Sequence, residues 1–254
     1  MCKCLFNVQC LFNVQMCKCV NVQMVAFTCT FPQTQQKKAT ICTFAHSHFC
    51  TLNKHSHICT LTQSFFPMRI ITGKYKGRHF EVPRTFKARP TTDFAKENLF
   101  NVLRAYVDFE DVTALDLFGG TGSISLELVS RGCQRVTTIE KDRKHFAFIQ
   151  QCQRTLGDEA WLPMCGDALR FIERCKESFD LVFADPPYAL PELGELPDRV
   201  MNSALVKEGG LFVLEHGKTY DFSSRSDFVE HRAYGSVNFS FFRKATDEEL
   251  TTTE

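Results

Sequence analysis

The sequence predicts an α/β fold built on a doubly wound, mostly parallel sheet in residues 111–244. Apolar runs typical of strands alternate there with helix-like stretches, as in a parallel sheet covered by helices on both faces. An acid stands at the carboxyl end of four predicted strands, at Asp116, Glu140, Asp167 and Asp185, and a glycine turn follows the first strand. Because ligands of such sheets bind beyond the carboxyl ends of the strands, we expect the four acids to line one crevice.

Local signals predict the individual elements of this domain. The stretch 123–130 is helix-like and is followed by Arg131 and Gly132, a typical end of a helix. A polar helix is expected over 142–155. Strands are expected at 112–117, 135–139, 161–165, 179–184, 210–215 and 237–243.

Residues 68–110 are predicted to form a small extension, a hairpin followed by a helix. Gly73 and Gly77 punctuate a β-favouring run over 68–83, and Thr92 is placed to cap a helix that runs to residue 103. Basic residues outnumber acidic ones nine to three between residues 69 and 104 and are interleaved with aromatic residues. This pattern suits phosphate contact and base stacking, and a solvated hairpin face explains it equally well.

Residues 1–67 differ from the rest of the chain in composition. They hold nine of the thirteen cysteines and no Asp or Glu, and CLFNVQ occurs twice in succession from residue 4. Such a charge-poor repeat predicts no packed structure, so we expect disorder there and a translation start at Met68. Cys and His residues between 42 and 59 are alternative zinc ligands, but their spacing matches no paired motif. The acidic tail at 245–254 is also expected to be disordered.

The composition excludes several classes of protein. A net charge of +1 gives no global signal for nucleic acid, so any basic surface must be local. No apolar run reaches the roughly 20 residues that span a bilayer. Polar residues interrupt every apolar stretch of the N-terminus, unlike in a signal peptide. The four cysteines after Met68 are typical of reduced thiols, and we expect a cytoplasmic protein with no membrane partner.

The glycine turn predicts a nucleotide-like ligand. Gly120 and Gly122 let the backbone approach a ligand closely, where a side chain would block it. Glu140 lies about 20 residues further on, where an acidic side chain can accept ribose hydroxyls, and Asp167 is placed to meet an adenine amino group. A nicotinamide dehydrogenase is the competing interpretation, but Ser125 occupies the third glycine position of its G-x-G-x-x-G motif.

The reaction itself is expected at Asp185, Pro186, Pro187 and Tyr188, directly after the strand at 179–184. An exocyclic base amine is a poor nucleophile because its lone pair is delocalised into the ring. The Asp185 carboxylate and the Pro186 carbonyl can accept its two N–H hydrogens and localise that lone pair. The two prolines stiffen the backbone, and Tyr188 can stack on a base turned out of its helix. A proline-rich turn without chemistry is the alternative.

These motifs resemble a known family. They are MRIITGKYKGR from residue 68, RPTTD followed by ENLFNVL, LDLFGGTGSISLELVSRG from residue 115, Glu140, and FADPPY from residue 183. The chain resembles class I methyltransferases with an (N/D)-P-P-(Y/F) motif, and more closely the bacterial small-subunit rRNA guanine-N2 methyltransferases of the RsmD type. The resemblance implies a Rossmann-like fold with a seven-stranded sheet, S-adenosylmethionine as donor, no metal, and 16S rRNA or the assembling small ribosomal subunit as partner.

The resemblance also implies roles for individual residues. The donor would contact Asp116, Phe118, Gly120, Gly122, Glu140 and Asp167, and the target base would meet Asp185, Pro186, Pro187 and Tyr188. The RNA would face Arg69, Lys74, Lys76, Arg78, Arg89, Thr91 and Thr92. Ser125 stands where the family often has Gly, and we expect this difference to spare the donor site.

Two rival functions use the same fold. DNA adenine-N6 and protein glutamine methyltransferases run similar chemistry, but they more often carry Asn at the position of Asp185. They normally need a recognition domain, and about 40 residues ahead of the sheet leave little room for one. A non-enzymatic RNA-binding module is the second rival, and the intact glycine turn argues against it. We expect the protein to be a monomer.

Overall fold

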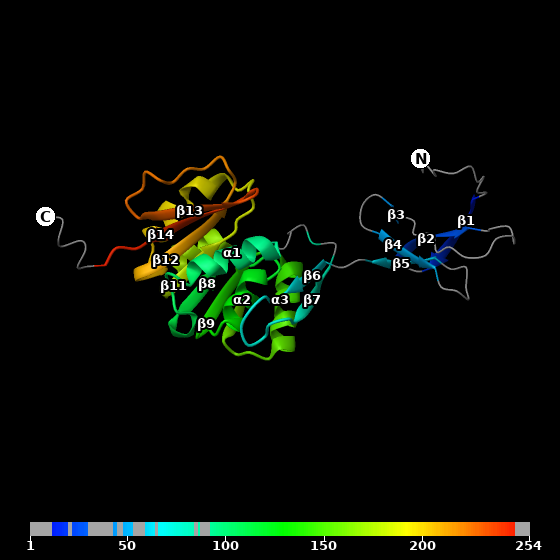
Figure 1. Cartoon of the computed structure of the whole chain (residues 1–254), viewed down its shortest axis with the longest axis horizontal. Helices are drawn as coiled ribbons and strands as arrows, with labels where there is room; N and C mark the ends of the chain where they lie inside the picture. Colours follow the sequence, from blue (N-terminus) through cyan, green and yellow to red (C-terminus); the bar gives the residue numbers. More distant parts are fainter. Residues whose placement is uncertain are drawn as a thin grey trace. The chain divides into compact units, whose positions relative to one another are not determined.

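The computed structural model describes residues 66–83, 86 and 92–246, and the strand backbones within residues 12–63. The chain divides into two compact units, Met1–Phe65 and Phe66–Glu254 (Figure 1). The second unit begins two residues before Met68, because the first strand of the predicted hairpin starts at Phe66. Residues 247–254, the predicted tail, lie outside the described residues.

The described residues of the first unit form five strands. We predicted none there, because the apolar residues follow no period of two. β1 (Phe12–Cys19) and β2 (Val22–Cys29) form an antiparallel pair. β3 (Thr43–Phe44), β4 (His48–Leu52) and β5 (Cys59–Gln63) form a three-stranded antiparallel sheet. The side chains of this unit, including the alternative zinc ligands, lie outside the described residues. The expected disorder and the expected translation start at Met68 stay predictions.

The second unit is built on a seven-stranded sheet with the strand order β10-β9-β8-β11-β12-β14-β13. Five strands are parallel, and β14 and β13 pair antiparallel at one edge. The strand order reverses between β8 and β11, which makes the carboxyl ends of these two strands the switch point where ligands of such sheets bind. The bounds are β8 (Thr113–Asp116), β9 (Arg135–Glu140), β10 (Trp161–Cys165), β11 (Phe179–Ala184), β12 (Val206–His216), β13 (Phe228–Tyr234) and β14 (Val237–Arg243).

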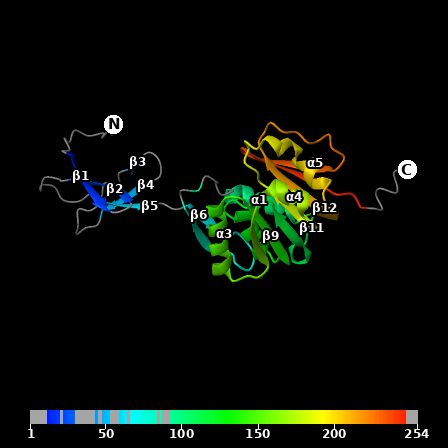
Figure 2. The ribbon, with the colours of Figure 1, turned by 180° about the vertical axis from the view of Figure 1, so that it is seen from behind.

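Helices cover both faces of this sheet, as predicted. α1 (Asp93–Leu103), α2 (Ser123–Ser130) and α3 (Arg143–Leu156) share one apolar core with residues such as Trp161 and Phe183 (Figure 1). α4 (Ala168–Arg174) and α5 (Leu196–Met201) pack with residues such as Val182 and Phe212 in the second core, on the face that Figure 2 shows. Neighbouring residues of one strand enter opposite cores, as strand geometry requires.

Local chemistry accounts for the helix ends. The Thr92 hydroxyl accepts a hydrogen bond from the Ala95 amide at 3.2 Å, which confirms the predicted cap of α1. The Asp142 carboxylate caps α3 in the same way, and Gly157 ends that helix in the left-handed conformation. Two short 3-10 helices, Phe109–Asp111 and Pro191–Glu195, are the remaining helices in the described part of the second unit. In the described part of the chain, no helix has the length and apolar character needed to cross a bilayer.

The hairpin predicted over 68–83 is confirmed, and it runs along α2. Its strands are β6 (Phe66–Arg69) and β7 (His79–Val82), which pair antiparallel. The loop between them packs on the end of α2, where a Cβ at Gly73 would lie 1.9 Å from the carbonyl oxygen of Ser130. Only glycine fits there, because its φ is +89° as well. The hairpin therefore reaches from one end of α2 to the other.

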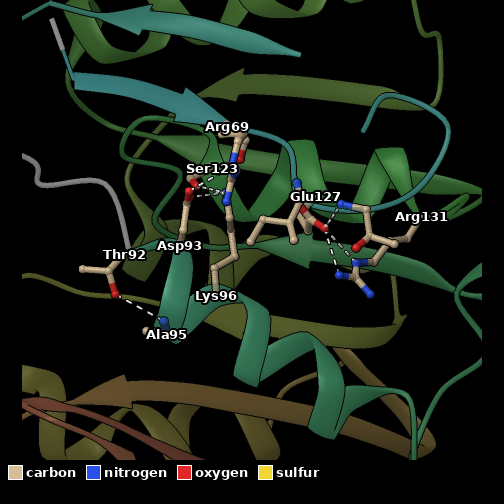
Figure 3. Close-up of polar contacts among 10 residues, drawn as sticks. Arg69, Thr92, Asp93, Ala95, Lys96, Ser123, Glu127 and Arg131 are labelled. Carbon is tan, nitrogen blue, oxygen red and sulfur yellow. Dashed lines mark hydrogen bonds and ion pairs between the residues drawn. The ribbon is translucent and has the colours of Figure 1, made fainter. Parts of the chain in front are cut away.

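A buried cluster of opposite charges, the Lys96–Glu127 cluster, fastens the hairpin and α1 to α2 (Figure 3). The Lys96 ammonium donates to the Arg69 carbonyl at 2.6 Å and to the Ser123 hydroxyl at 3.1 Å. The Glu127 carboxylate accepts from the backbone amides of residues 71 and 72 at 2.8 and 3.0 Å and from the Arg131 guanidinium at 2.9 and 3.0 Å. Since Lys96 and Glu127 are almost fully buried, these bonds compensate the cost of burying their charges.

Candidate active site

The predicted acids meet at the switch point of the sheet. Asp116 ends β8, Glu140 ends β9 and Asp185 follows β11, so the three lie on neighbouring strands at one edge. Asp116 is close enough to both others for their charges to interact. Asp167 follows β10, and the Gly166 amide beside it donates to the Glu140 carbonyl at 3.0 Å. The four acids therefore line one edge in the order of their strands.

The glycine turn between β8 and α2 is shaped by close approach to the rest of the fold. A Cβ at Gly119 would lie 2.5 Å from the Thr138 methyl group, and one at Gly122 would lie 3.2 Å from the Trp161 ring. Gly120 and Gly122 also have positive φ angles of 54° and 78°. The turn thus needs glycine at three positions, of which the sequence analysis singled out the last two.

Two of the acids already make hydrogen bonds within the protein. The Glu140 carboxylate accepts from the Gly120 amide at 2.7 Å and from the Asp142 amide at 2.6 Å, so it ties the glycine turn to the loop before α3. Asp167 accepts from the Arg170 amide at 3.2 Å and pairs with Lys141 at 2.8 Å. The Lys141 ammonium lowers the pKa of Asp167. Both carboxylates are fixed in orientation and partly exposed, as a ligand contact requires.

Asp116 is buried, and only one of its two carboxylate oxygens has a hydrogen-bond partner in the described structure. Its Oδ2 accepts a hydrogen bond from the Ser125 hydroxyl at 2.5 Å, while its Oδ1 has no partner in the described structure. Burial raises the pKa of Asp116 to about 6, and the Glu140 charge adds to this rise. Ser125 also lies 2.6 Å from the Thr138 hydroxyl. The residue that differs from the family pattern is therefore a direct neighbour of the predicted donor site.

Asp185 shares its surroundings with a carboxylate that the sequence analysis did not single out. Glu215 lies near the end of β12, is 6% exposed, and accepts a hydrogen bond from the Tyr188 hydroxyl at 3.2 Å. Burial, then the charges of Glu215 and Asp116, raise the pKa of Asp185 well above its usual value. Burial also raises the pKa of Glu215 to about 7. We refer to Asp116, Asp185 and Glu215 as the acid cluster.

The remaining residues of the predicted reaction centre lie around this cluster. Pro186 is buried, Pro187 is exposed, and the Pro187 carbonyl accepts from the Leu190 amide at 2.8 Å, which closes the turn. Tyr188 is 49% exposed despite its size. Phe118 is partly buried against the second core. An exposed ring held by one buried hydrogen bond is available for stacking, as the sequence analysis expects.

Comparison with known proteins identifies the family. Residues 68–243 match the family model described as Conserved hypothetical protein 95, the RsmD family. The chain belongs to this family of class I methyltransferases. Ribosomal RNA small subunit methyltransferase D of Escherichia coli is 31% identical over 148 residues, which cover 58% of this chain and 74% of the relative.

Solved structures agree with this assignment. A candidate methyltransferase from Escherichia coli is 26% identical, with a TM-score of 0.63 over 72% of this chain and all of that one. A Thermus thermophilus 16S rRNA N2 G1207 methyltransferase, solved with AdoMet and guanosine, has a TM-score of 0.56 over 71% of this chain and 50% of that one. At 18% identity, this second likeness supports the fold alone. The Rossmann-like class I fold of this methyltransferase is thereby confirmed.

The predicted RNA contacts of this RsmD-family methyltransferase fall into two groups. Arg69 lies near the start of α2, because Lys96 bonds both the Arg69 carbonyl and the Ser123 hydroxyl, and Arg69 pairs with Asp93 at 3.1 Å. Thr92 caps α1 next to Asp93. Lys74, Lys76 and Arg78 lie in the hairpin loop at the other end of α2, where the Lys74 amide donates to the Ser130 carbonyl at 2.7 Å. Arg89 and Thr91 lie outside the described residues.

The cations of the hairpin loop differ in their partners. Lys74 pairs with Asp158 at 2.8 Å, and this hydrogen bond raises the pKa of Lys74. Lys76 and Arg78 are exposed, and neither pairs with a carboxylate among the described residues. The Arg78 guanidinium lies 5.1 Å from the centre of the Tyr75 ring. Lys76 and Arg78 are thus the loop cations that remain available to phosphates.

Glu215 is the main site residue that sequence reasoning missed, although a signal for it existed. The strand predicted at 210–215 ends at Glu215, so the rule that singled out the other acids applies to it as well. Ser125 was noted only as a departure from a glycine pattern. Its contact with Asp116 could not be foreseen, because it depends on how α2 returns over β8.

Proposed function

We propose that this protein transfers a methyl group from S-adenosylmethionine to the exocyclic N2 amine of a guanine in 16S rRNA. The observation that carries the proposal is the acid cluster at the switch point, beside a glycine turn of the kind that binds nucleotide-like ligands. Three acids converge there, and Asp116 and Glu215 are buried while Asp185 is partly buried. Two of their oxygens, Oδ1 of Asp116 and Oε2 of Glu215, lack a hydrogen-bond partner in the described structure. Such a site favours a cationic ligand and N–H donors.

The residues present fit the donor. The glycine turn leaves its backbone open to close approach, and the oriented Glu140 and Asp167 carboxylates suit hydroxyl and amino groups of a nucleoside. Asp116 would contribute a buried carboxylate to the site that holds this positively charged donor. When bound, the donor supplies a methyl group on a good, neutral leaving group. We assign donor contacts to Asp116, Phe118, Gly120, Gly122, Glu140 and Asp167.

The residues after β11 would hold the amine. The Asp185 carboxylate and the Pro186 carbonyl accept its N–H hydrogens, which localises the nitrogen lone pair toward the methyl group. Tyr188 stacks on the extruded base, since its ring is half exposed while its hydroxyl is held by Glu215. Pro186 and Pro187 keep this turn rigid. The protein therefore contributes position and electrostatics, and the donor contributes the reactive group.

The rRNA substrate is supported by the family and by the two-part basic surface. The names of relatives such as small subunit methyltransferase D point to 16S rRNA, and we extend that substrate to this chain. Lys76 and Arg78 would contact phosphates at one end of α2, and Arg69 would do so beside the crevice. Assembly of the small subunit in the cytoplasm is the corresponding setting, and the proposal requires no second copy of the chain.

The test is methyl transfer to defined substrates. Purified protein and labelled donor are incubated with small-subunit particles and free 16S rRNA from cells lacking this enzyme, and with naked DNA. Mass spectrometry of the digested rRNA should show one new N2-methylguanosine. Labelled N6-methyladenine in the DNA, or labelled glutamine in ribosomal protein, would instead support the rival methyltransferases. Loss of donor binding, with no transfer to any substrate, would support a non-enzymatic RNA-binding module.

A further inference from the structure

Glu215 is a buried carboxylate in the acid cluster with no place in the chemistry assigned so far. Its Oε1 accepts the hydrogen bond from Tyr188, and its Oε2 has no donor within reach in the described structure. Ala184 pairs with Leu214 in the parallel strands β11 and β12, so Asp185 and Glu215 are the next residues on two neighbouring strands. After burial and charge, a hydrogen bond with Glu215 also raises the pKa of Asp185. Two carboxylates have no hydrogen to share, so such a bond requires one of the two groups to be protonated.

The surroundings favour this shared proton. Asp116 adds a further negative charge, and Tyr188 supplies a hydroxyl whose pKa burial raises, so it stays neutral. His216 follows Glu215 on β12, but its two ring nitrogens lie 2.8 Å from the Ser240 hydroxyl and from the Gly217 carbonyl. No Lys, Arg or His among the described residues pairs with Asp185 or Glu215. Like charges buried together without a cation retain a proton at pH values where isolated carboxyls have lost it.

We propose that Glu215 is a positioning residue that shares one proton with Asp185, holds Tyr188 by its hydroxyl, and so sets the pH range in which Asp185 accepts the proton of the target amine. This inference rests on the proposed function for the identity of the amine. The shared proton does not depend on the proposed function, because it follows from the placement of the two carboxyls alone.

The proposed step consists of a methyl transfer followed by a proton transfer. The guanine N2 nitrogen forms a bond to the methyl carbon while the carbon–sulfur bond breaks, and the electron pair of that bond stays on sulfur. The nitrogen then carries one proton too many, and Asp185 takes it up in the form of the pair that has lost its shared proton, so the pair goes from no proton to one. Glu215 shares the proton through the bond between the two carboxyls, and water removes it after the product leaves. A carboxyl pair that titrates near neutral pH suits this task better than an isolated, weakly basic carboxylate.

A purely structural role for Glu215 makes different predictions. If Glu215 served only to hold Tyr188, Glu215→Gln would keep that hydrogen bond and leave the titration of Asp185 unchanged. If the proton is shared, Glu215→Gln removes the negative neighbour that raises the pKa of Asp185, so Asp185 ionises at lower pH. Tyr188→Phe is the matched control, because it removes the hydroxyl bond and leaves both carboxyls in place.

The first experiment needs no RNA. Infrared difference spectra of the purified full chain record the C=O band of protonated carboxyls as a function of pH. We expect a carboxyl in the wild type that titrates near neutral pH, is lost in Asp185→Asn, and moves to lower pH in Glu215→Gln. It should persist in Tyr188→Phe. Identical titration curves for the wild type and Glu215→Gln would overturn the inference.

The second experiment measures transfer to small-subunit particles at several pH values. Glu215→Gln should lower kcat by about tenfold at neutral pH, leave the donor Kd within about threefold, and move the acid limb of the kcat/KM profile to lower pH. Glu215→Asp should restore part of the rate. If the acid limb of the kcat/KM profile of Glu215→Gln lies at the same pH as that of the wild type, the inference is contradicted. If the wild type shows no transfer to rRNA, the proposed function fails, while the infrared titration still tests the shared proton.

Discussion

Two groups of buried charges in the second unit show opposite solutions to the same problem. The Lys96–Glu127 cluster combines both signs, and none of its side-chain nitrogens and oxygens is buried without a hydrogen-bond partner. The acid cluster contains only carboxylates, and two of its oxygens are buried without one. One group is complete within the protein, whereas the other is completed only by something that the protein binds.

This difference separates a structural role from a functional one. A satisfied ion pair holds the hairpin and α1 on α2 whether or not a ligand is present. An unsatisfied cluster of like charges costs stability in the free protein and gains favourable interactions when a cation or N–H donor arrives. Changes in the first group should therefore lower stability, and changes in the second should lower activity and raise stability.

The largest effect is expected for Asp185→Ala in the acid cluster. Without the acceptor for the amine hydrogens, the rate of methyl transfer should fall by about a thousandfold or more. The donor Kd, measured by calorimetry, should stay within a few fold. Asp185→Asn is the control, because its amide oxygen still accepts one hydrogen bond and should retain more activity. Lost donor binding in a folded Asp185→Ala protein would contradict the role of that carboxylate.

The next effect concerns the Lys96–Glu127 cluster. Glu127→Ala removes the acceptor of four hydrogen bonds and leaves two amides and the Arg131 guanidinium buried without it. Urea unfolding should show a loss of about 3 kcal/mol or more. Glu127→Gln keeps an acceptor for the amides but loses the charge, so its loss should be smaller. Equal stability of Glu127→Ala and the wild type would remove the distinction between the two groups.

A smaller effect on stability, a gain instead of a loss, is expected for Glu215→Gln. The pKa of Glu215 is raised to about 7 in the folded protein, so its contribution to stability is present below its unfolded pKa and is lost as the pH rises through 7. Glu215→Gln should therefore be more stable than the wild type by about 2 kcal/mol at about pH 8, and by much less at about pH 5. Urea unfolding of both proteins at the two pH values measures this. An equal gain in stability at the two pH values would indicate that the substitution acts through packing and not through the pKa of Glu215.

The smallest effect is expected for Ser125→Ala. This change removes the hydrogen bond from the Ser125 hydroxyl, which lowers the pKa of Asp116, and leaves the Oδ2 oxygen of that carboxyl without this donor. We expect a stability loss of about 1 kcal/mol at neutral pH. Ser125→Gly, which restores the common family residue, is the matched comparison. If the alanine variant binds the donor as the wild type does, Ser125 serves the fold rather than the site.

Most of the fold was predictable from the sequence because its signals are local. The apolar runs of β8 and β11, the Thr92 cap and the turn at Gly132 each depend on a few neighbouring residues. β13 was missed because most of it is exposed and shows no regular alternation of apolar residues. The helices α4 and α5 were missed because they have only seven and six residues, too few for a clear helical period.

The site was predictable where one rule of parallel sheets applies and unpredictable where contacts span the chain. The strand-end rule located Asp116, Glu140 and Asp185, and the same rule reaches Glu215. The pairing of Asp185 with Glu215, 30 residues further on, depends on β11 and β12 being neighbours. The bond from Lys96 to Ser123 joins two elements 27 residues apart. Sequence patterns do not report such distances.

The path of the hairpin along α2 has a consequence for substrate size. The glycine turn lies at the start of this eight-residue helix, and the loop with Lys76 and Arg78 lies at its end. A helix of that length measures about 12 Å, more than one nucleoside spans. A lone guanosine would reach only one end of α2, whereas a folded RNA could contact both ends. The turnover rate should therefore depend on the structure of the RNA around the modified base.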